Sequence, residues 1–264
     1  MTEEIQVIQK SGIGSDTTNI AIQNNYGISA EQATQIAINM FMDNFPKLQV
    51  EAEKVAKERA EELCKEVIKQ LERKGKKEYE EFTNPDVQYV FYEAQKGYAR
   101  FGESELLELL SELVSDRIMA EGKSYVKRVL DKAVELVLAL TPSLMDYLSF
   151  IFLTKHIKVS SIIDCETLRN HCEYVCKKIV VEPNIVERNS YLNMLGCFEL
   201  NIGPASKFFS KTYNIDEAEI SKILPEQYKY IPNDYALTPA AIVIAIINAQ
   251  KKTEFTFDMS IWIK

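Results

Sequence analysis

Residues 106–117 read LLELLSELVSDR, and this stretch decides the fold class that the sequence predicts. Its leucines recur at intervals of one, three and four residues, which gathers them on one side of an α-helix. The apolar positions continue the helical period on both sides of the stretch. We therefore predict a strongly amphipathic helix over residues 103–120, with its leucines facing a core.

Similar helical patterns flank this stretch. Three further helices are predicted, at residues 86–100, 124–140 and 143–157. Gly102, Gly122 and Pro142 punctuate the short connections between them. Consecutive amphipathic helices with short connections form antiparallel bundles. The sequence therefore predicts a mainly α protein whose helical bundle occupies residues 29–157.

The predicted bundle begins with a longer helical region. Ser29 and Gln32 form a capping-box pattern that starts a helix at residue 29. Pro46 is expected to interrupt this helix, because proline removes a backbone donor. A second helix is predicted over residues 47–74, supported by Glu-before-Lys pairs one turn apart.

The first 28 residues differ from the rest of the chain. They are polar and rich in Asn, Gln, Thr, Ser, Gly and Ile, with short apolar alternations at Ile5, Val7, Ile20 and Ile22. This alternation is typical of short β-strands. An isolated hairpin with so small an apolar face is not stable. We expect this leader to be disordered alone, to pair with another strand, or to pair with copies of itself.

Residues 158–264 are predicted as a mixed helical subdomain that ends in a β-strand. In the last ten residues, apolar side chains alternate strictly with others; they are Phe255, Phe257, Met259, Ile261 and Ile263. Such a strand needs a partner, and the leader is the best candidate. We predict a small β-element formed by the N- and C-terminal strands, within one chain or between subunits. The apolar residues of both segments are the predicted oligomerisation residues.

Composition excludes several classes of protein. The 264-residue chain has a formal net charge of −8, which argues against direct nucleic-acid binding. Its five cysteines are odd in number and follow no basic secretory leader, so a cytoplasmic location is expected. The apolar stretches at residues 136–153 and 237–249 are interrupted or too short to span a bilayer, and we expect no constitutive membrane association.

One cysteine-rich segment is a candidate metal site. Cys172 and Cys176 lie one helical turn apart and could present two thiolates to zinc, with Cys165 and His171 as the nearest further ligands. His171 and Cys172 are adjacent, however, and face different sides of a helix. Free buried cysteines are therefore favoured, and neither a metal nor a cofactor is expected.

Other catalytic chemistry has weak support in the sequence. The two histidines, His156 and His171, lie in no catalytic motif. Three carboxylates and one lysine within 216–222 loosely resemble the active site of a metal-dependent nuclease; they are Asp216, Glu217, Glu219 and Lys222. They fall on a predicted helix, so a solvated helix face is favoured. Asp116 and Arg117 are predicted to form a buried structural pair.

Several stretches carry a family resemblance. They are ERAEE (58–62), NPDVQY (84–89), YEAQ (92–95), YAR (98–100), LLELLSELVSDR (106–117), VLDKA (129–133), LTP (140–142), FIFL (150–153) and the leader step TNIAIQ (18–23). They resemble a family of uncharacterised bacterial proteins. The bundle from Leu106 onward is also distantly similar to the abortive-infection alpha-type helical domain. The resemblance implies a bacterial cytosolic protein from a defence or mobile-element setting, and it supplies no catalytic residues.

The sequence thus favours a non-enzymatic, homo-oligomeric interaction protein of bacterial anti-phage defence. Its expected partners are copies of itself, with another defence protein as a further candidate. Two alternatives stay open at this point. One is a carboxylate- and metal-dependent nuclease or nucleotide-acting effector; the other is a membrane-perturbing effector that exposes residues 136–153 or 237–249.

Overall fold

The computed structural model describes the backbone of residues 30–75, 80–120, 122, 124–200 and 203–263, and the side chains of these residues outside 30–48, 80 and 124. The chain divides into two units, Met1–Glu51 and Ala52–Lys264. The predicted leader, with Ile5, Val7, Ile20 and Ile22, lies outside the described residues, as does the capping serine at position 29.

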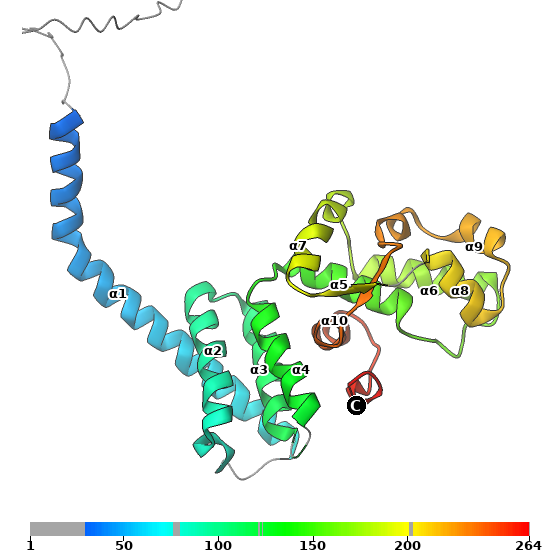
Figure 1. The fold of residues 1–264 in the computed structure, drawn as a ribbon, viewed down its shortest axis with the longest axis horizontal. Helices are drawn as coiled ribbons and strands as arrows, with labels where there is room; N and C mark the ends of the chain where they lie inside the picture. The colour runs from blue at the N-terminus through cyan, green and yellow to red at the C-terminus, as the bar shows by residue number, and fades with distance from the viewer. Residues whose placement is uncertain (1–29, 76–79, 121, 123, 201–202, 264) are drawn as a thin grey trace, which may run out of the picture. The chain divides into compact units, whose positions relative to one another are not determined.

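The described residues contain ten α-helices and one two-stranded sheet (Figure 1). The helices are α1 (Ala30–Arg73), α2 (Pro85–Phe101), α3 (Ser104–Met119), α4 (Ser124–Val137), α5 (Pro142–Lys155), α6 (Cys165–Lys178), α7 (Asn189–Met194), α8 (Ala205–Tyr213), α9 (Glu217–Ile223) and α10 (Pro239–Lys252). The strands are β1 (Phe198–Leu200) and β2 (Tyr235–Leu237), and they pair antiparallel. The predicted class, a mainly α helical bundle with a small β-element, is confirmed.

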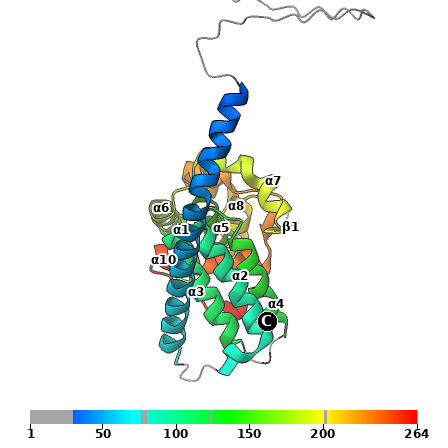
Figure 2. The same ribbon diagram turned by 90° about the vertical axis from the view of Figure 1, so that its left-hand side faces the viewer.

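Helices α2, α3 and α4 lie side by side (Figures 1 and 2). The predicted start of α2 is confirmed, because the Asn84 side chain accepts a hydrogen bond from the Asp86 amide at 3.0 Å. Gly102 ends α2 with a φ of 68°, a conformation that glycine adopts without strain. The leucines of α3 at positions 109, 110 and 113 are buried, as the sequence predicted.

Helix α10 lies at the centre of the unit and packs against α5, α4 and α3. Every residue from Ala240 to Ala249 is buried, which explains why this helix is apolar on all sides. The Ser149 hydroxyl of α5 donates to the Ala245 carbonyl of α10 at 3.1 Å and accepts from the Asn248 amide at 2.9 Å. Helices from both sides of residue 157 thus contribute to one core. The predicted three-part division of the chain stays a prediction.

The predicted interruption at Pro46 is wrong, because α1 continues past it as one helix. A proline within a helix removes one backbone hydrogen bond and bends the helix, while the bonds on either side can persist. Within the second unit, α1 buries Leu63 and contacts α2 through polar groups. Arg59 donates to the Ala99 carbonyl at 2.9 Å, and the Tyr98 hydroxyl donates to Glu62 at 2.7 Å.

The sheet is not made by the chain termini. Strands β1 and β2 both lie within residues 158–264, which the sequence predicts as a mixed helical subdomain, and neither lies in the last ten residues. Gly196, with a φ of 80°, follows the short α7 and redirects the chain. Phe198 then pairs with Leu237, and the Phe198 and Tyr235 rings stack with centroids 5.2 Å apart.

The predicted C-terminal strand is also wrong. After α10 the chain continues without regular structure and ends in a single 3₁₀ turn at Met259–Ile261. Aromatic side chains of this segment pack on α5 of the same chain. Phe257 contacts Phe152 with ring centroids 5.1 Å apart, and Trp262 contacts Phe152 at the same distance. The oligomerisation role of Phe255, Phe257, Met259, Ile261 and Ile263 stays a prediction.

No helix within the described ranges combines the length and apolar character needed to cross a membrane.

Candidate functional site

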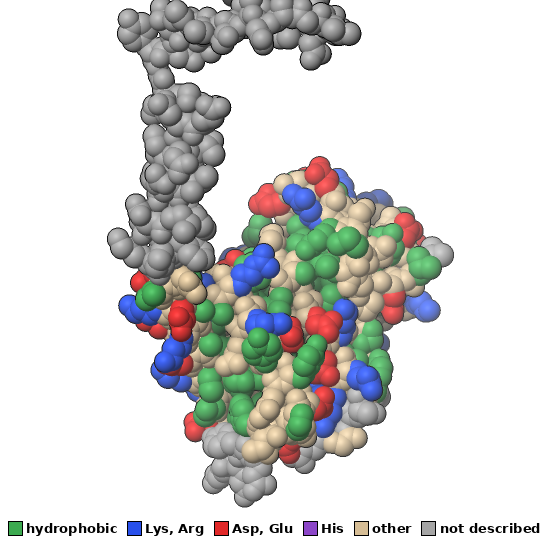
Figure 3. All heavy atoms as spheres, turned by 60° about the vertical axis from the view of Figure 1, so that its left-hand side comes forward, with side chains coloured by type: hydrophobic (Ala, Val, Ile, Leu, Met, Phe, Trp, Pro, Cys, Tyr) green, Lys and Arg blue, Asp and Glu red, His purple; other side chains and the backbone are tan. Residues whose placement is uncertain are grey.

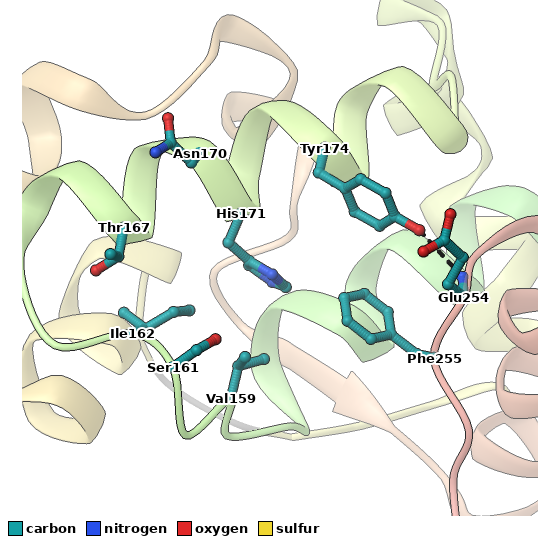
Figure 4. Close-up of a pocket in the computed structure, with 9 residues that line it drawn as sticks. All are labelled: Val159, Ser161, Ile162, Thr167, Asn170, His171, Tyr174, Glu254 and Phe255. Carbon is teal, nitrogen blue, oxygen red and sulfur yellow. Dashed lines mark hydrogen bonds between the residues drawn. The ribbon is translucent and has the colours of Figure 1, made fainter.

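A pocket opens between α6, the connection that follows α5 and the segment that follows α10 (Figure 4). Its volume is about 540 Å³, and it is lined by Val159, Ser161, Ile162, Thr167, Asn170, His171, Tyr174, Glu254 and Phe255. The four residues from α6 follow helical spacing, so one face of this helix forms a wall. A capping box between Asp164 and Thr167 fixes the start of α6.

His171 points into this pocket beside Phe255 (Figure 4), and the two ring centroids are 5.7 Å apart. Burial lowers the pKa of His171 to about 4, so its imidazole is neutral at pH 7. Tyr174 connects α6 to the segment after α10, because its hydroxyl accepts a hydrogen bond from the Glu254 amide at 3.0 Å. The His171 ring therefore adds no charge to the pocket wall at pH 7.

A second pocket of about 500 Å³ adjoins the first, and both are lined by Val159 and Phe255. Its full lining is His156, Ile157, Lys158, Val159, Ser160, Phe255, Thr256, Phe257, Asp258, Ile261 and Trp262. We call the two pockets together the tail groove; residues 156–162, α6 and residues 254–262 form it. Aromatic and aliphatic side chains dominate its walls, which suits apolar ligand groups.

The segment after α10 presents part of its backbone to solvent along the tail groove. Thr253 and Asp258 have extended backbone conformations. The amides of Phe255 and Phe257 donate to the Thr253 hydroxyl and the Gln250 side chain, at 3.3 and 2.7 Å. Thr256 between them is exposed, and it makes no hydrogen bond with any described residue. Its backbone is therefore open to a further strand.

His156, the other histidine, has a structural role. Its Nε2 accepts a hydrogen bond from the Leu237 amide of β2 at 3.2 Å, and its ring stacks on Phe152. Burial, together with the charge of the neighbouring Lys155, lowers the pKa of His156 to about 4. The neutral ring is the form that accepts this backbone donor.

The candidate metal ligands of the cysteine-rich segment are not arranged around one point. Cys172 is buried, whereas Cys165 lies near the surface with its thiol 3.7 Å from Glu219. Burial raises the pKa of the Cys172 thiol to about 12 and that of Cys176 to about 11, so both stay protonated at pH 7. Within the described part of the chain, no group of three or more His, Cys, Asp or Glu residues is arranged to hold a metal ion.

The acidic residues at 216–219 serve local structure. Asp216 caps α9 by accepting from the amides of Ala218 and Glu219, at 2.9 and 3.2 Å. Glu217 accepts from the Ser206 hydroxyl at 2.9 Å. These carboxylates are therefore engaged in capping and in contacts between α8 and α9.

The predicted Asp116–Arg117 pair is wrong, because each residue has other partners. Asp116 pairs with Lys74 at 2.6 Å. Arg117, whose side chain is 2% exposed, binds Asp86 and Asp131, both at 2.5 Å. Adjacent residues on a helix face different directions, so both could not point at one another. Desolvation raises the pKa of Asp116, while Lys74 acts in the opposite direction.

Sequence reasoning missed most of the tail groove. It singled out His171 as a metal ligand and Phe255 as part of a strand, and it did not place the two side by side. The spacing of Thr167, Asn170, His171 and Tyr174 on one helix face was a usable signal. The 156–162 connection gave no such signal, because its position depends on contacts with distant segments.

Comparison with known proteins identifies a family without naming an activity. One family model, whose description is only “:-like”, matches residues 27–233. This match covers more than half of the chain, so the chain belongs to that family. No curated protein and no solved structure matches the chain.

Proposed function

We propose that this protein is a non-enzymatic interaction protein that self-associates, and that residues 1–28 of one copy bind the tail groove of another. The observation that carries the proposal is Thr256 in the lining of the groove: this residue is exposed, and its backbone makes no hydrogen bond with any described residue. An extended peptide can add to such a backbone, with main-chain hydrogen bonds supplying affinity and side-chain pockets supplying specificity.

The leader has the sequence that this groove requires. Ile5 and Val7, like Ile20 and Ile22, are separated by one polar residue, so each pair places two apolar side chains on the same face of a strand. The groove offers Phe255, Trp262 and a neutral His171 to such side chains. A short strand with so small an apolar face needs a partner, and the groove would supply one.

The roles of the polar residues support binding over catalysis. His156 accepts a backbone amide, Asp216 caps a helix and Glu217 holds Ser206. Three of the residues that the sequence offers as catalytic candidates thus contribute to the fold. Figure 3 shows hydrophobic side chains interspersed with charges of both signs on one face of the molecule.

The cellular setting is proposed on separate grounds. All five cysteines are free thiols, and two of them, Cys172 and Cys197, are buried. Free cysteines suit a reducing cytoplasm. The resemblance to abortive-infection alpha-type domains is the basis for proposing a role in bacterial anti-phage defence.

Substitution of Thr256 tests the groove directly. Thr256→Pro removes the backbone donor that an added strand would use, and the exposed side chain makes no hydrogen bond with the described residues. We expect the wild-type chain to form particles heavier than its 30.2 kDa protomer. Light scattering coupled to size exclusion should show a lower particle mass for Thr256→Pro and an unchanged mass for Thr256→Ala. Equal masses for wild type and Thr256→Pro, at unchanged circular dichroism, would rule the groove out.

A further inference from the structure

A further pocket, which shares Lys158 with the tail groove, gathers positive charge. It has a volume of about 610 Å³ and is lined by Lys155, Lys158, Gly203, Pro204, Lys207, Phe208, Lys211 and Thr212. We call it the lysine pocket, after its four lysines. Among the described residues that line it there is no carboxylate. This concentration of positive charge is notable in a chain whose net charge is −8.

Lys155 is the most buried of the four lysines, with a residue exposure of 6%. Its ammonium donates to the carbonyls of Pro232 and Tyr235, at 2.6 and 3.2 Å. An ammonium has three donors, so these two bonds fix its position and leave one donor for a ligand. Burial lowers the pKa of Lys155, while Asp234 opposes this shift. A buried cation held by neutral carbonyls lacks a full counter-charge.

Helix α8 adds two more lysines from one face. Lys207 and Lys211 are four residues apart in α8, so they lie one turn above each other and repel. The helix begins beside the pocket, where Pro204 provides no side-chain cap for the first amides. An anion in the pocket would relieve the repulsion and would also meet the positive end of the helix dipole.

We propose that the lysine pocket binds a small molecule that carries a diphosphate group. Each phosphate group carries a charge of about −1.5 to −2 near neutral pH, so two neighbouring phosphates match four lysines better than a single carboxylate does. The bounded volume and the acidity of the whole chain favour a small molecule over a nucleic acid. Phe208 provides an aromatic ring against which an organic part of the ligand can pack.

Calorimetric titration with inorganic pyrophosphate, on the full chain, tests this site. The informative variant is Lys207→Gln/Lys211→Gln. Both lysines are exposed, and their substitution leaves the buried Lys155 in place. Its matched control is Lys69→Gln/Lys132→Gln, which removes the same charge from exposed residues that do not line the pocket. We expect saturable binding to the wild type and to the control, and affinity weaker by about tenfold or more per lost lysine in the pocket variant.

The free and the nucleotide-linked diphosphate are distinguished by a parallel titration with adenosine diphosphate. Tighter binding of the nucleotide would indicate that Phe208 contacts the base, and equal binding would indicate that the diphosphate alone is recognised; both support the site. Absence of pyrophosphate binding at millimolar concentration would overturn the proposal. So would equal affinity in the pocket variant, or binding of a single-stranded oligonucleotide without binding of pyrophosphate.

Discussion

At the residue scale, burial rather than a charged partner controls the protonation of His171. Its ring lies in the tail groove against Phe255, and its pKa falls from 6.5 to about 4. In the unfolded chain the same imidazole takes up a proton near its ordinary pKa. Folding therefore favours the neutral form, and this preference appears in the dependence of stability on pH.

The sign of this dependence follows from the lowered pKa. Above about 6.5 both states are neutral and the full stability is present; as the pH falls from about 6.5 to about 4, only the unfolded state gains the proton. We therefore expect the free energy of unfolding to decrease over this range. Urea denaturation near pH 7 and near pH 5 measures the decrease, to which His156 contributes as well. His171→Leu should lose part of it, and an unchanged pH dependence in this variant would contradict the buried, neutral state of His171.

Individual polar contacts were the least predictable feature of the sequence. Asp116 and Arg117 looked like a pair because they are adjacent and follow a leucine-rich stretch. Arg117 instead binds Asp86 and Asp131, which lie 31 and 14 residues away in the chain. Such partners are chosen by the way helices pack together, which sequence spacing does not encode.

At the element scale, helix prediction was accurate wherever a cap or a breaker accompanied the apolar period. Asn84 and Gly102 bound α2 as the sequence indicated, and Thr141 caps α5 by accepting from the Leu144 amide at 3.4 Å. Errors arose where tertiary contacts compete with local pattern. The alternation at residues 255–263 indicates a strand, but four of its five apolar side chains pack on the core instead, and Ile261 is exposed.

The anchoring of this segment can be observed through Trp262, the one tryptophan in the chain. Phe257 contacts both Phe152 and Trp262, with centroids 5.1 and 6.3 Å apart. We expect Phe257→Ala to loosen the segment and shift tryptophan emission to longer wavelength, because the indole meets more water. Far-UV circular dichroism should keep its helical signal, since α10 remains packed. Unchanged emission in this variant would show that Phe257 does not hold the segment in place.

At the scale of the whole molecule, the sequence predicts the class of fold but not which helices and strands pack against one another. The apolar stretch at residues 237–249 contains most of α10, yet nothing in the local sequence indicates that this helix packs against α4 and α5. The sheet was assigned to the termini because those segments alternate, whereas β1 and β2 are three residues each and too short to give a pattern. The tail groove joins residues 156–162 and α6 to residues 254–262, about 100 residues further along the chain. The sequence therefore predicts single residues of the groove but not the groove itself.

Self-association through the leader is the central claim about the whole molecule. It requires residues 1–28 as the ligand and the tail groove as the receptor, so removal of the leader should have the same effect as blocking Thr256. Deletion of the leader leaves the described core intact, because the contacts that hold the Ala52–Lys264 unit lie within that unit.

The most direct test is the particle mass in solution, measured by light scattering for the full chain and for the chain without residues 1–28. We expect the full chain to form particles of two or more 30.2 kDa protomers and the shortened chain to be monomeric. Addition of a synthetic peptide of residues 1–28 to the shortened chain should show saturable binding. The same number of protomers per particle with and without the leader would contradict the account.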